Sequence, residues 1–278
     1  AEVFAHQRIT ENNDIITDFQ TDNLMEQILH KDNLNKAYKK VKSNKGAGGI
    51  DGMSVEELLG YLRNNQEQLI QKLKDGKYKP NPVRRVEIPK ETKGEFRKLG
   101  VPTVVDRVFQ QAITQVLSPI YEKQFSENSF GFRPDRGAHD ALKQCQTNVN
   151  DGYVYVVDMD LEKFFDTVCQ SKLIEVLSRT IKDGRVISLI HKYLNAGVIS
   201  RGIFEKTEVG MPQGGPLSPL LSNIMLNELD KELTRRGHRF VRYADDCMIF
   251  CKSRKSAERT LNLSLIHISE PTRLRRIS

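Results

Sequence analysis

The sequence predicts an α+β fold, in which amphipathic helices pack against antiparallel strands. The first observation is residues 239–251, where two β-favouring runs flank a tight Ala244-Asp-Asp246 turn. The second is residues 83–101, where two short alternating runs flank the turn-rich segment at residues 90–95. The third is a series of longer segments with apolar side chains at three- and four-residue spacing, the period of an α-helix.

The individual elements follow from the same periodicities. Helices are expected at residues 22–43 (two short ones), 54–74, 103–124, 137–150, 171–181, 184–195 and 218–236. Ser54 and Glu57 form a capping-box pattern at the start of one helix, which we expect to break near Asn64. Pro119 is expected to kink or divide another helix. The continuous β-favouring run Tyr153–Asp160 predicts a central, buried strand.

Composition limits the classes of partner and compartment. Lys and Arg outnumber Asp and Glu by 43 to 36, a formal charge of +7. This excess fits a nucleic-acid partner, although it also fits a basic protein that has none. The four cysteines form no C-x-x-C pair, which argues against a zinc site. Free thiols, the absence of a membrane-length apolar run and the lack of a signal pattern favour a cytoplasmic protein.

The most informative residues are aspartates on β elements. Asp160 ends an apolar strand, and Asp245 and Asp246 lie at the tip of the later hairpin. Adjacent carboxylates repel each other, and a bound cation removes that cost. Carboxylate oxygens suit Mg²⁺, and two such ions can activate a 3′-hydroxyl and stabilise a leaving pyrophosphate.

An Asp-Asp pair can also be an ordinary polar turn, because Asp is a common turn residue. The strongly apolar β flanks weaken that reading here. Strand alternation places Asp245 on the face of Tyr243 and Cys247, with Asp246 opposite. On that argument Asp245 bridges both ions and Asp246 has a supporting role.

Three motifs resemble those of reverse transcriptases. Tyr243-Ala-Asp-Asp246 resembles their metal-binding motif, and Asp160-Leu-Glu-Lys-Phe-Phe-Asp166 resembles their other catalytic segment. Met211-Pro-Gln-Gly-Gly-Pro-Leu-Ser-Pro219 resembles the motif beneath the nascent base pair. Their order and rough spacing also match the family.

Further segments resemble group II intron-encoded reverse transcriptases of the bacterial type. Residues 44–53 are similar to the N-terminal extension motif, and residues 97–107 and 129–134 are similar to the fingers motifs. Phe240-Val-Arg-Tyr-Ala-Asp-Asp246 is typical of the same group. The resemblance covers roughly residues 23–262 and implies a right-hand polymerase fold with fingers and palm.

The resemblance also implies a domain organisation. We expect a flexible tail at residues 1–21 and an N-terminal extension at 22–53. The reverse transcriptase domain would span 54–262, with fingers at about 54–110 and 169–212 and palm at about 111–168 and 213–262. Residues 263–278 resemble a translated sequencing adapter, which implies a non-native tail and a chain that stops before the thumb. Such a fragment is expected to be inactive or poorly processive.

Roles transfer position by position. Asp160, Asp245 and Asp246 match the catalytic, metal-binding acids, whereas Asp158 and Asp166 lie near but do not match. Phe165 matches the steric gate that excludes a ribose 2′-hydroxyl, although it or Phe164 could instead be a core aromatic. The resemblance further implies nucleotide binding by Lys90, Arg97 and Gln213. The expected nucleic-acid-binding residues are Arg84, Arg85, Lys98, Arg133, Gly214 and Gly215. The glycines would let backbone approach the nucleic acid closely.

The implied function is RNA-directed DNA polymerase (EC 2.7.7.49) of a group II intron, which copies intron RNA and assists splicing. Two Mg²⁺ ions, or Mn²⁺, are the expected cofactors. The partners would be intron RNA template, DNA primer or target DNA, and deoxynucleoside triphosphates, with no membrane. Two alternatives stay open: a non-catalytic RNA-binding maturase fragment, and a retron or defence-type reverse transcriptase.

Overall fold

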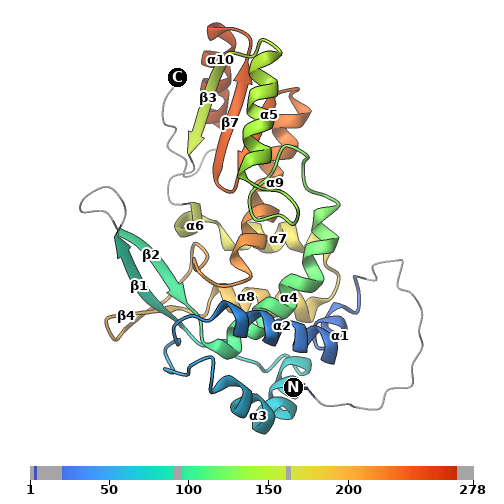
Figure 1. Cartoon of the computed structure of the whole chain (residues 1–278), viewed down its shortest axis with the longest axis vertical. Coiled ribbons are helices and arrows are strands. Elements are labelled where there is room, and N and C mark those ends of the chain that lie inside the picture. The colour runs from blue at the N-terminus through green and yellow to red at the C-terminus, as the bar shows by residue number, and fades with distance from the viewer. Residues whose placement is uncertain (1–2, 5–20, 90–95, 161–163, 268–278) are drawn as a thin grey trace. The chain divides into compact units, whose positions relative to one another are not determined.

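The computed structural model describes residues 3–4, 21–89, 96–160 and 164–267, apart from the side chains of Asp160 and of residues 262–267. Its internal contacts divide the chain into two compact units (Figure 1). The first unit comprises residues 1–120 and 169–218, and the second comprises 121–168 and 219–278. The names fingers and palm stay a prediction for these units.

The helices of the first unit follow the apolar periodicity of the sequence. They are α1 (Leu24–Ile28), α2 (Lys31–Asn44), α3 (Leu58–Lys74), α7 (Gln170–Thr180) and α8 (Gly184–Leu194), together with most of α4 (Val104–Glu122). The two short helices predicted at residues 22–43 and those predicted at 171–181 and 184–195 are therefore confirmed.

The expected break at Asn64 is wrong, and the expected division of a helix at Pro119 does not occur. The helix α3 continues through Asn64, where a break was expected. The predicted capping contact does form, since the Ser54 amide donates to Glu57 Oε2 at 2.8 Å. Pro119 lies inside α4 and does not divide it. Proline removes only one hydrogen bond there, and the helix ends three residues later at Glu122.

A four-stranded sheet completes the first unit, with the order β2-β1-β4-β5. The predicted hairpin is confirmed as β1 (Val83–Pro89) and β2 (Phe96–Val101), which pair antiparallel. The strands β4 (Val198–Ser200) and β5 (Ile203–Glu205) were not predicted. Their three-residue length is too short for an alternation pattern, and both residues of their connecting turn, Arg201 and Gly202, have positive φ.

The second unit contains a three-stranded sheet with helices on both sides. Its strands are β3 (Tyr155–Asp160), β6 (Arg239–Tyr243) and β7 (Asp246–Cys251), in the order β3-β7-β6. Its helices are α5 (Ala138–Asn150), α6 (Phe164–Thr167), α9 (Ser218–Arg235) and α10 (Arg254–His267). Among the described strands β3 lies at the sheet edge and β7 is central, so the prediction of a central β3 is wrong.

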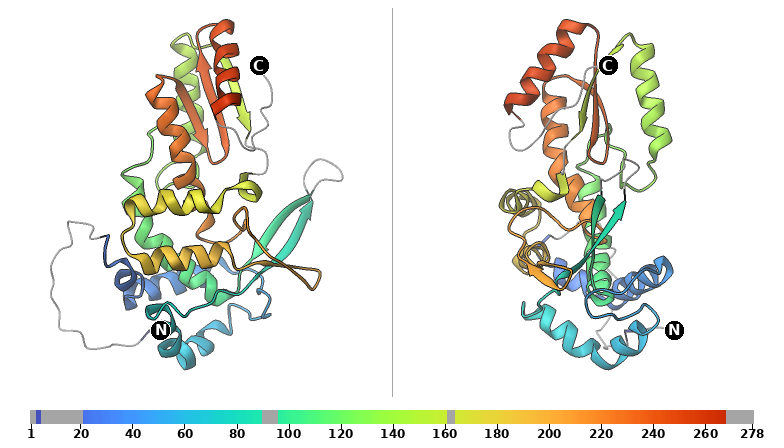
Figure 2. Two further views of the ribbon diagram at one scale, coloured as in Figure 1. Left: turned by 180° about the vertical axis from the view of Figure 1, so that it is seen from behind. Right: turned by 90° about the vertical axis from the view of Figure 1, so that its left-hand side faces the viewer.

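The two faces of this sheet have separate cores. Met159, Cys247 and Ile249 belong to a buried cluster that includes Leu233 of α9 and Ala257 of α10. Val241 and Phe250 pack on the other face with Ala141 of α5. The right-hand view of Figure 2 shows α5 on one side of the strands and α10 on the other. The expected boundary at residue 263 falls inside α10, which continues to His267.

Candidate active site

The strand register of the second unit brings carboxylates from distant segments to one place. Asp160 at the end of β3 is the cross-strand partner of Asp246, and Asp246 also pairs with Tyr243 of β6. Cross-strand partners point their side chains to the same face of a sheet. Asp246 is exposed, and so are Tyr243 and Asp158, which share this face. The face is therefore covered by α5 at one end and open at the end that carries the aspartates.

The alternation argument for Asp245 is wrong. Asp245 belongs to the two-residue loop between β6 and β7 and not to a strand. Because the loop resets the alternation, Tyr243 is exposed whereas Cys247 is fully buried on the opposite face. It is Asp246 that shares the face of Tyr243 and Asp160.

The loop has a conformation that depends on its neighbours. Ala244 has a φ of 57°, a left-handed conformation that a residue with a Cβ rarely adopts. Gly131 packs directly on this loop, because a Cβ at Gly131 would lie 2.3 Å from the Ala244 amide nitrogen. The segment around residue 131 therefore fits closely against the aspartate turn.

The donor chemistry at this place fits a hard divalent cation. Asp246 supplies an exposed carboxylate, Asp245 is half-buried, and the register pairs Asp246 with Asp160. Among the side chains that the structure describes, which exclude that of Asp160, no group of three His, Cys, Asp or Glu is arranged to hold a metal ion. Oxygen ligands of this kind suit Mg²⁺, which keeps several waters and takes one or two carboxylates.

Phe165 lies on the short helix α6, in the same unit as the aspartates. Its ring meets that of Phe164 edge to face, with centroids 5.6 Å apart. Both rings are half-buried, so neither has the full burial expected of a core aromatic.

The basic residues of the first-unit hairpin lie on both of its faces. Register places Arg84 and Arg97 on one face, and Arg85 and Lys98 on the other. Arg97 and Lys98 are exposed. The Arg84 guanidinium donates to the Gly48 carbonyl at 2.9 Å, and Arg85 forms a 2.6 Å ion pair with Glu205. Lys90 lies outside the described residues.

Gln213, Gly214 and Gly215 also belong to the first unit, where they pack on their own chain. The Gly100 amide of β2 donates to the Gln213 carbonyl at 2.5 Å. A Cβ at Gly214 would lie 2.7 Å from the Gly100 carbonyl oxygen, and one at Gly215 would lie 2.4 Å from an oxygen of Gln110. These glycines therefore have an intramolecular reason for lacking a side chain, besides the expected approach of nucleic acid.

Arg133 is buried, which corrects its expected place in a nucleic-acid surface. Its side chain is only 2% exposed and pairs with Glu122 at 2.5 Å. It also donates to the carbonyls of Ser126 and Ser129. We therefore treat Arg133 as a structural residue of the second unit.

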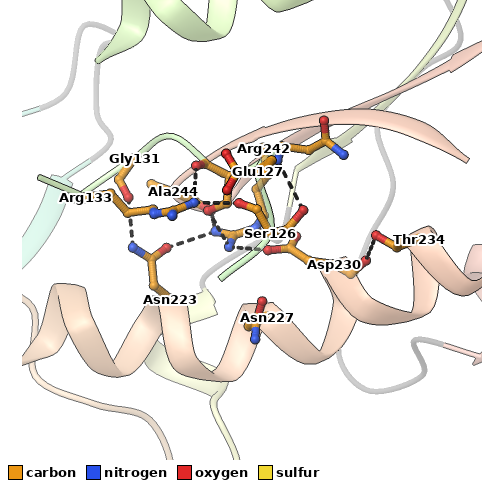
Figure 3. Close-up of polar contacts among 12 residues, drawn as sticks. Ser126, Glu127, Gly131, Arg133, Asn223, Asn227, Asp230, Thr234, Arg242 and Ala244 are labelled. Atoms are coloured by element: carbon orange, nitrogen blue, oxygen red, sulfur yellow. Dashed lines mark hydrogen bonds and ion pairs between the residues drawn. The ribbon is translucent and has the colours of Figure 1, made fainter. Parts of the chain in front are cut away.

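A buried polar cluster that was not predicted from the sequence contacts the loop at Ala244 (Figure 3). Arg242 and Asp230 form an ion pair in which neither side chain is exposed, and Asn223 joins it. One signal was available, since Arg242 interrupts the apolar β run before Tyr243. A charged residue at that position requires either solvent or a buried partner.

Comparison with known proteins identifies the class. The model of the family "Reverse transcriptase (RNA-dependent DNA polymerase)" matches residues 88–270. The chain therefore belongs to the reverse transcriptase family. Among its relatives is the group II intron-encoded protein LtrA of Lactococcus lactis subsp. cremoris, 38% identical over 236 residues, which are 85% of this chain and 39% of LtrA.

The chain is also similar to two further relatives and to a solved structure. Protein YkfC of Escherichia coli K12 is 39% identical, over 77% of this chain and 57% of its own. The putative COX1/OXI3 intron 2 protein of Saccharomyces cerevisiae is 37% identical, over 72% of this chain and 23% of its own. A chain of a partial Cas6-RT-Cas1--Cas2 complex shares the fold, with a TM-score of 0.54 and 25% identity over 88% of this chain and 43% of that one.

The expected resemblance to group II intron reverse transcriptases and maturases is confirmed by these relatives. The chain spans less than half the length of LtrA. Within the described residues, no helix combines the length and the apolar character needed to cross a membrane.

Proposed function

We propose that this chain is the catalytic region of an RNA-directed DNA polymerase encoded by a group II intron. The observation that carries the proposal is the register of β3 and β7, which pairs Asp160 with Asp246 beside the loop residue Asp245. Family membership and the intron-encoded relatives support the same reaction. The substrates would be an intron RNA template, a DNA primer or target DNA, and deoxynucleoside triphosphates.

Asp160, Asp245 and Asp246 are the residues that would hold two Mg²⁺ ions, or Mn²⁺ in their place. When bound, such ions supply activation of the 3′-hydroxyl and stabilisation of the leaving pyrophosphate. Asp246 is exposed at the open end of its sheet face, which leaves it accessible to solvent and to a substrate phosphate. The proposal gives Asp158 no metal-binding role, and Asp158→Asn is therefore a matched control on the same strand.

Residues of the first unit would bind the nucleotide and the template. Arg97 and Lys98 are exposed cations on opposite faces of one strand, so that they can bind different phosphate groups of the substrates. Lys90 and Gln213 are assigned to nucleotide binding by resemblance alone.

Phe165, in the second unit, would exclude a ribose 2′-hydroxyl, and its half-buried ring leaves a surface for that contact.

The experiment is primer extension by the 278-residue chain on an RNA template with deoxynucleotides and Mg²⁺, alongside Mn²⁺ binding measured by titration. We expect Mn²⁺ binding to depend on Asp160, Asp245 and Asp246, and any extension to stop in their Asn variants. Unaltered Mn²⁺ binding and extension in all three variants would refute the metal assignment. Asp158→Asn should leave both readouts close to those of the unmodified chain.

A second candidate is binding of intron RNA as a splicing cofactor without DNA synthesis. It is favoured by the similarity to nuclear intron maturase 2 of Arabidopsis thaliana, 30% identical over 49% of this chain. RNA binding should weaken when Arg97 and Lys98 are both changed to Gln, with a smaller salt dependence of affinity. Splicing assistance that survives Asp160→Asn would separate this activity from polymerisation.

A further inference from the structure

Arg242 places a positive charge in the interior of the second unit. Neither its side chain nor that of Asp230 on α9 has any exposed surface. Burial of a charge is costly unless the charge is paired and fully hydrogen-bonded. Arg242 Nε donates to Asp230 Oδ1 at 2.7 Å, and Nη2 donates to Oδ2 at 2.6 Å. This two-point pairing fixes the plane of the guanidinium.

The remaining guanidinium hydrogens also have acceptors (Figure 3). Nη1 donates to Asn223 Oδ1 at 3.0 Å and to the Ala244 carbonyl at 2.8 Å, and Nη2 donates to Ser129 Oγ at 2.8 Å. A guanidinium has five N–H donors, and all five are used here. One of these bonds ends on the loop that carries Asp245.

Other contacts surround the same loop. Asn223 accepts from Arg242 and donates to the Gly131 carbonyl at 2.8 Å. Gly131 in turn packs against the Ala244 amide. The carbonyl of Arg242 accepts from the Phe130 amide at 2.9 Å, which ties this segment to β6. Two contacts therefore hold Ala244. One is the hydrogen bond from Arg242, which pairs with Asp230 on α9, and the other is the packing of Gly131.

We propose that Arg242 is a positioning residue for the metal-binding turn. Held by Asp230, its guanidinium fixes the Ala244 carbonyl and so stabilises the left-handed conformation of Ala244. That conformation sets the directions in which Asp245 and Asp246 leave the hairpin. The inference rests on the proposed polymerase function, because only metal binding gives those directions a chemical role.

The five hydrogen bonds of Arg242 also show which property a test substitution must remove, namely the planar fork of donors. Lysine keeps a positive charge but presents a single ammonium with three donors and no planar fork. In Arg242→Lys the ammonium can pair with Asp230 or reach the Ala244 carbonyl, but it cannot reproduce all five bonds. The charge is thus conserved while the support of the turn is weakened.

The test compares Arg242→Lys with Arg185→Lys in the 278-residue chain. Arg185 belongs to the first unit, whereas residues 239–251 belong to the second, and it pairs with Asp183 at 2.9 Å and Glu26 at 2.7 Å. Its variant therefore also disturbs a two-carboxylate ion pair of an arginine, in the unit that does not contain the hairpin. The readouts are amide hydrogen exchange of residues 239–251 and Mn²⁺ affinity. We expect Arg242→Lys to weaken Mn²⁺ binding by about 10–100-fold and to speed exchange at the turn, as loss of an outer-shell support does. Arg185→Lys should leave both readouts close to those of the unmodified chain.

Where extension is measurable, the positioning role predicts a fall in kcat with little change in KM for the deoxynucleotide. A folded Arg242→Lys protein with unchanged turn exchange and unchanged Mn²⁺ affinity would overturn the inference. If Arg242→Lys does not fold, Asn223→Ala takes its place, since it removes the link between Gly131 and Arg242 and keeps the ion pair with Asp230. Unchanged exchange and affinity in that variant would overturn the inference equally.

Failure of the proposed function gives a different result. If the unmodified chain binds no Mn²⁺ and Asp245→Asn changes nothing, the metal assignment is wrong and the positioning role is wrong with it. If the unmodified chain binds Mn²⁺ through Asp245 but Arg242→Lys binds equally well, only the role of Arg242 is refuted.

Discussion

Asp160 and Asp246 are cross-strand partners at the last rung of the β3–β7 ladder. They lie 86 positions apart in the printed sequence, and only the pairing of the two strands brings them together. Carboxylates that a strand register brings close repel each other, and a bound cation removes that cost. The register therefore supports the proposed metal binding, which neither residue indicates alone.

The first prediction concerns this pair and the loop beside it. Asp160→Asn, Asp245→Asn and Asp246→Asn should each lower polymerase activity by about a hundredfold or more, because each removes a metal-binding charge. Asp158→Asn should change activity by less than about threefold, since Asp158 lies on the same face but outside the set. Single-turnover primer extension with Mg²⁺ measures both. A loss in Asp158→Asn equal to that in Asp246→Asn would contradict the assignment.

The carboxylates were predictable from the sequence, but their geometry was not. An aspartate after an apolar strand and an Asp-Asp turn in a β hairpin are visible as patterns. The sheet face on which an aspartate lies depends on how many residues the loop contains. The predicted alternation counted the two loop residues as part of a strand, so it assigned Asp245 and Asp246 to the wrong faces. Arg133 shows the same limit, since a basic residue in the sequence does not reveal the half-buried Glu122 partner that neutralises it.

The second prediction concerns sugar selection. Phe165→Ala should admit ribonucleotides and lower the preference for deoxynucleotides by about 10–100-fold, because a pocket that loses a side chain loses its steric discrimination. Phe164→Ala is the matched control, since it removes the other ring of the same edge-to-face pair. The measurement is kcat/KM for a deoxynucleotide and its ribonucleotide. Equal effects of the two variants would argue against a gate at Phe165.

The third prediction concerns Gly131. A Cβ there would lie 2.3 Å from the Ala244 amide nitrogen, which is backbone and cannot rotate away. Gly131→Ala should therefore destabilise the chain by about 1–3 kcal/mol and displace the aspartate turn. Gly60→Ala on the exposed surface of α3 has open space around the new methyl group and should stabilise the helix by about 0.5–1 kcal/mol. Urea unfolding of both variants distinguishes close packing from a general effect of alanine.

The fold was predictable where a segment carried its own periodicity. Helices with continuous apolar stripes and the two long hairpins appear at the expected residues, because local spacing determines which face is buried. Sheet order was not predictable, since the apolar run of β3 fits an edge strand with both faces partly covered as well as a central strand. The short pair β4 and β5 depends on its pairing with β1 and has no local signal of its own.

The fourth prediction concerns pH. Burial, and secondarily the charge of Arg236, lowers the pKa of His238 below its ordinary value of 6.5. In the window between the lowered pKa and about 6.5, the unfolded chain binds more protons than the folded one, so stability rises with pH. This contribution is lost as the pH falls through that window. His238→Gln should make the unfolding free energy depend less on pH, which urea unfolding between about pH 5 and 7.5 would measure. An unchanged pH dependence would show that other groups cause it.

The last prediction separates stability from positioning at the buried ion pair. Asp230→Leu leaves the Arg242 guanidinium buried without its counter-charge and should cost about 3–5 kcal/mol of unfolding free energy. The double variant Asp230→Leu with Arg242→Met removes both charges, and well-packed apolar replacements of a buried ion pair are often neutral. We therefore expect the double variant to regain most of the lost stability.

Metal affinity should not recover in that double variant. The Ala244 carbonyl loses its donor whether or not the core is repacked, so the turn stays unsupported while the fold is restored. Denaturant unfolding and Mn²⁺ titration of the same samples give the two quantities. Recovery of both would mean that the ion pair serves the core alone; recovery of stability without metal affinity would tie Arg242 to the aspartates.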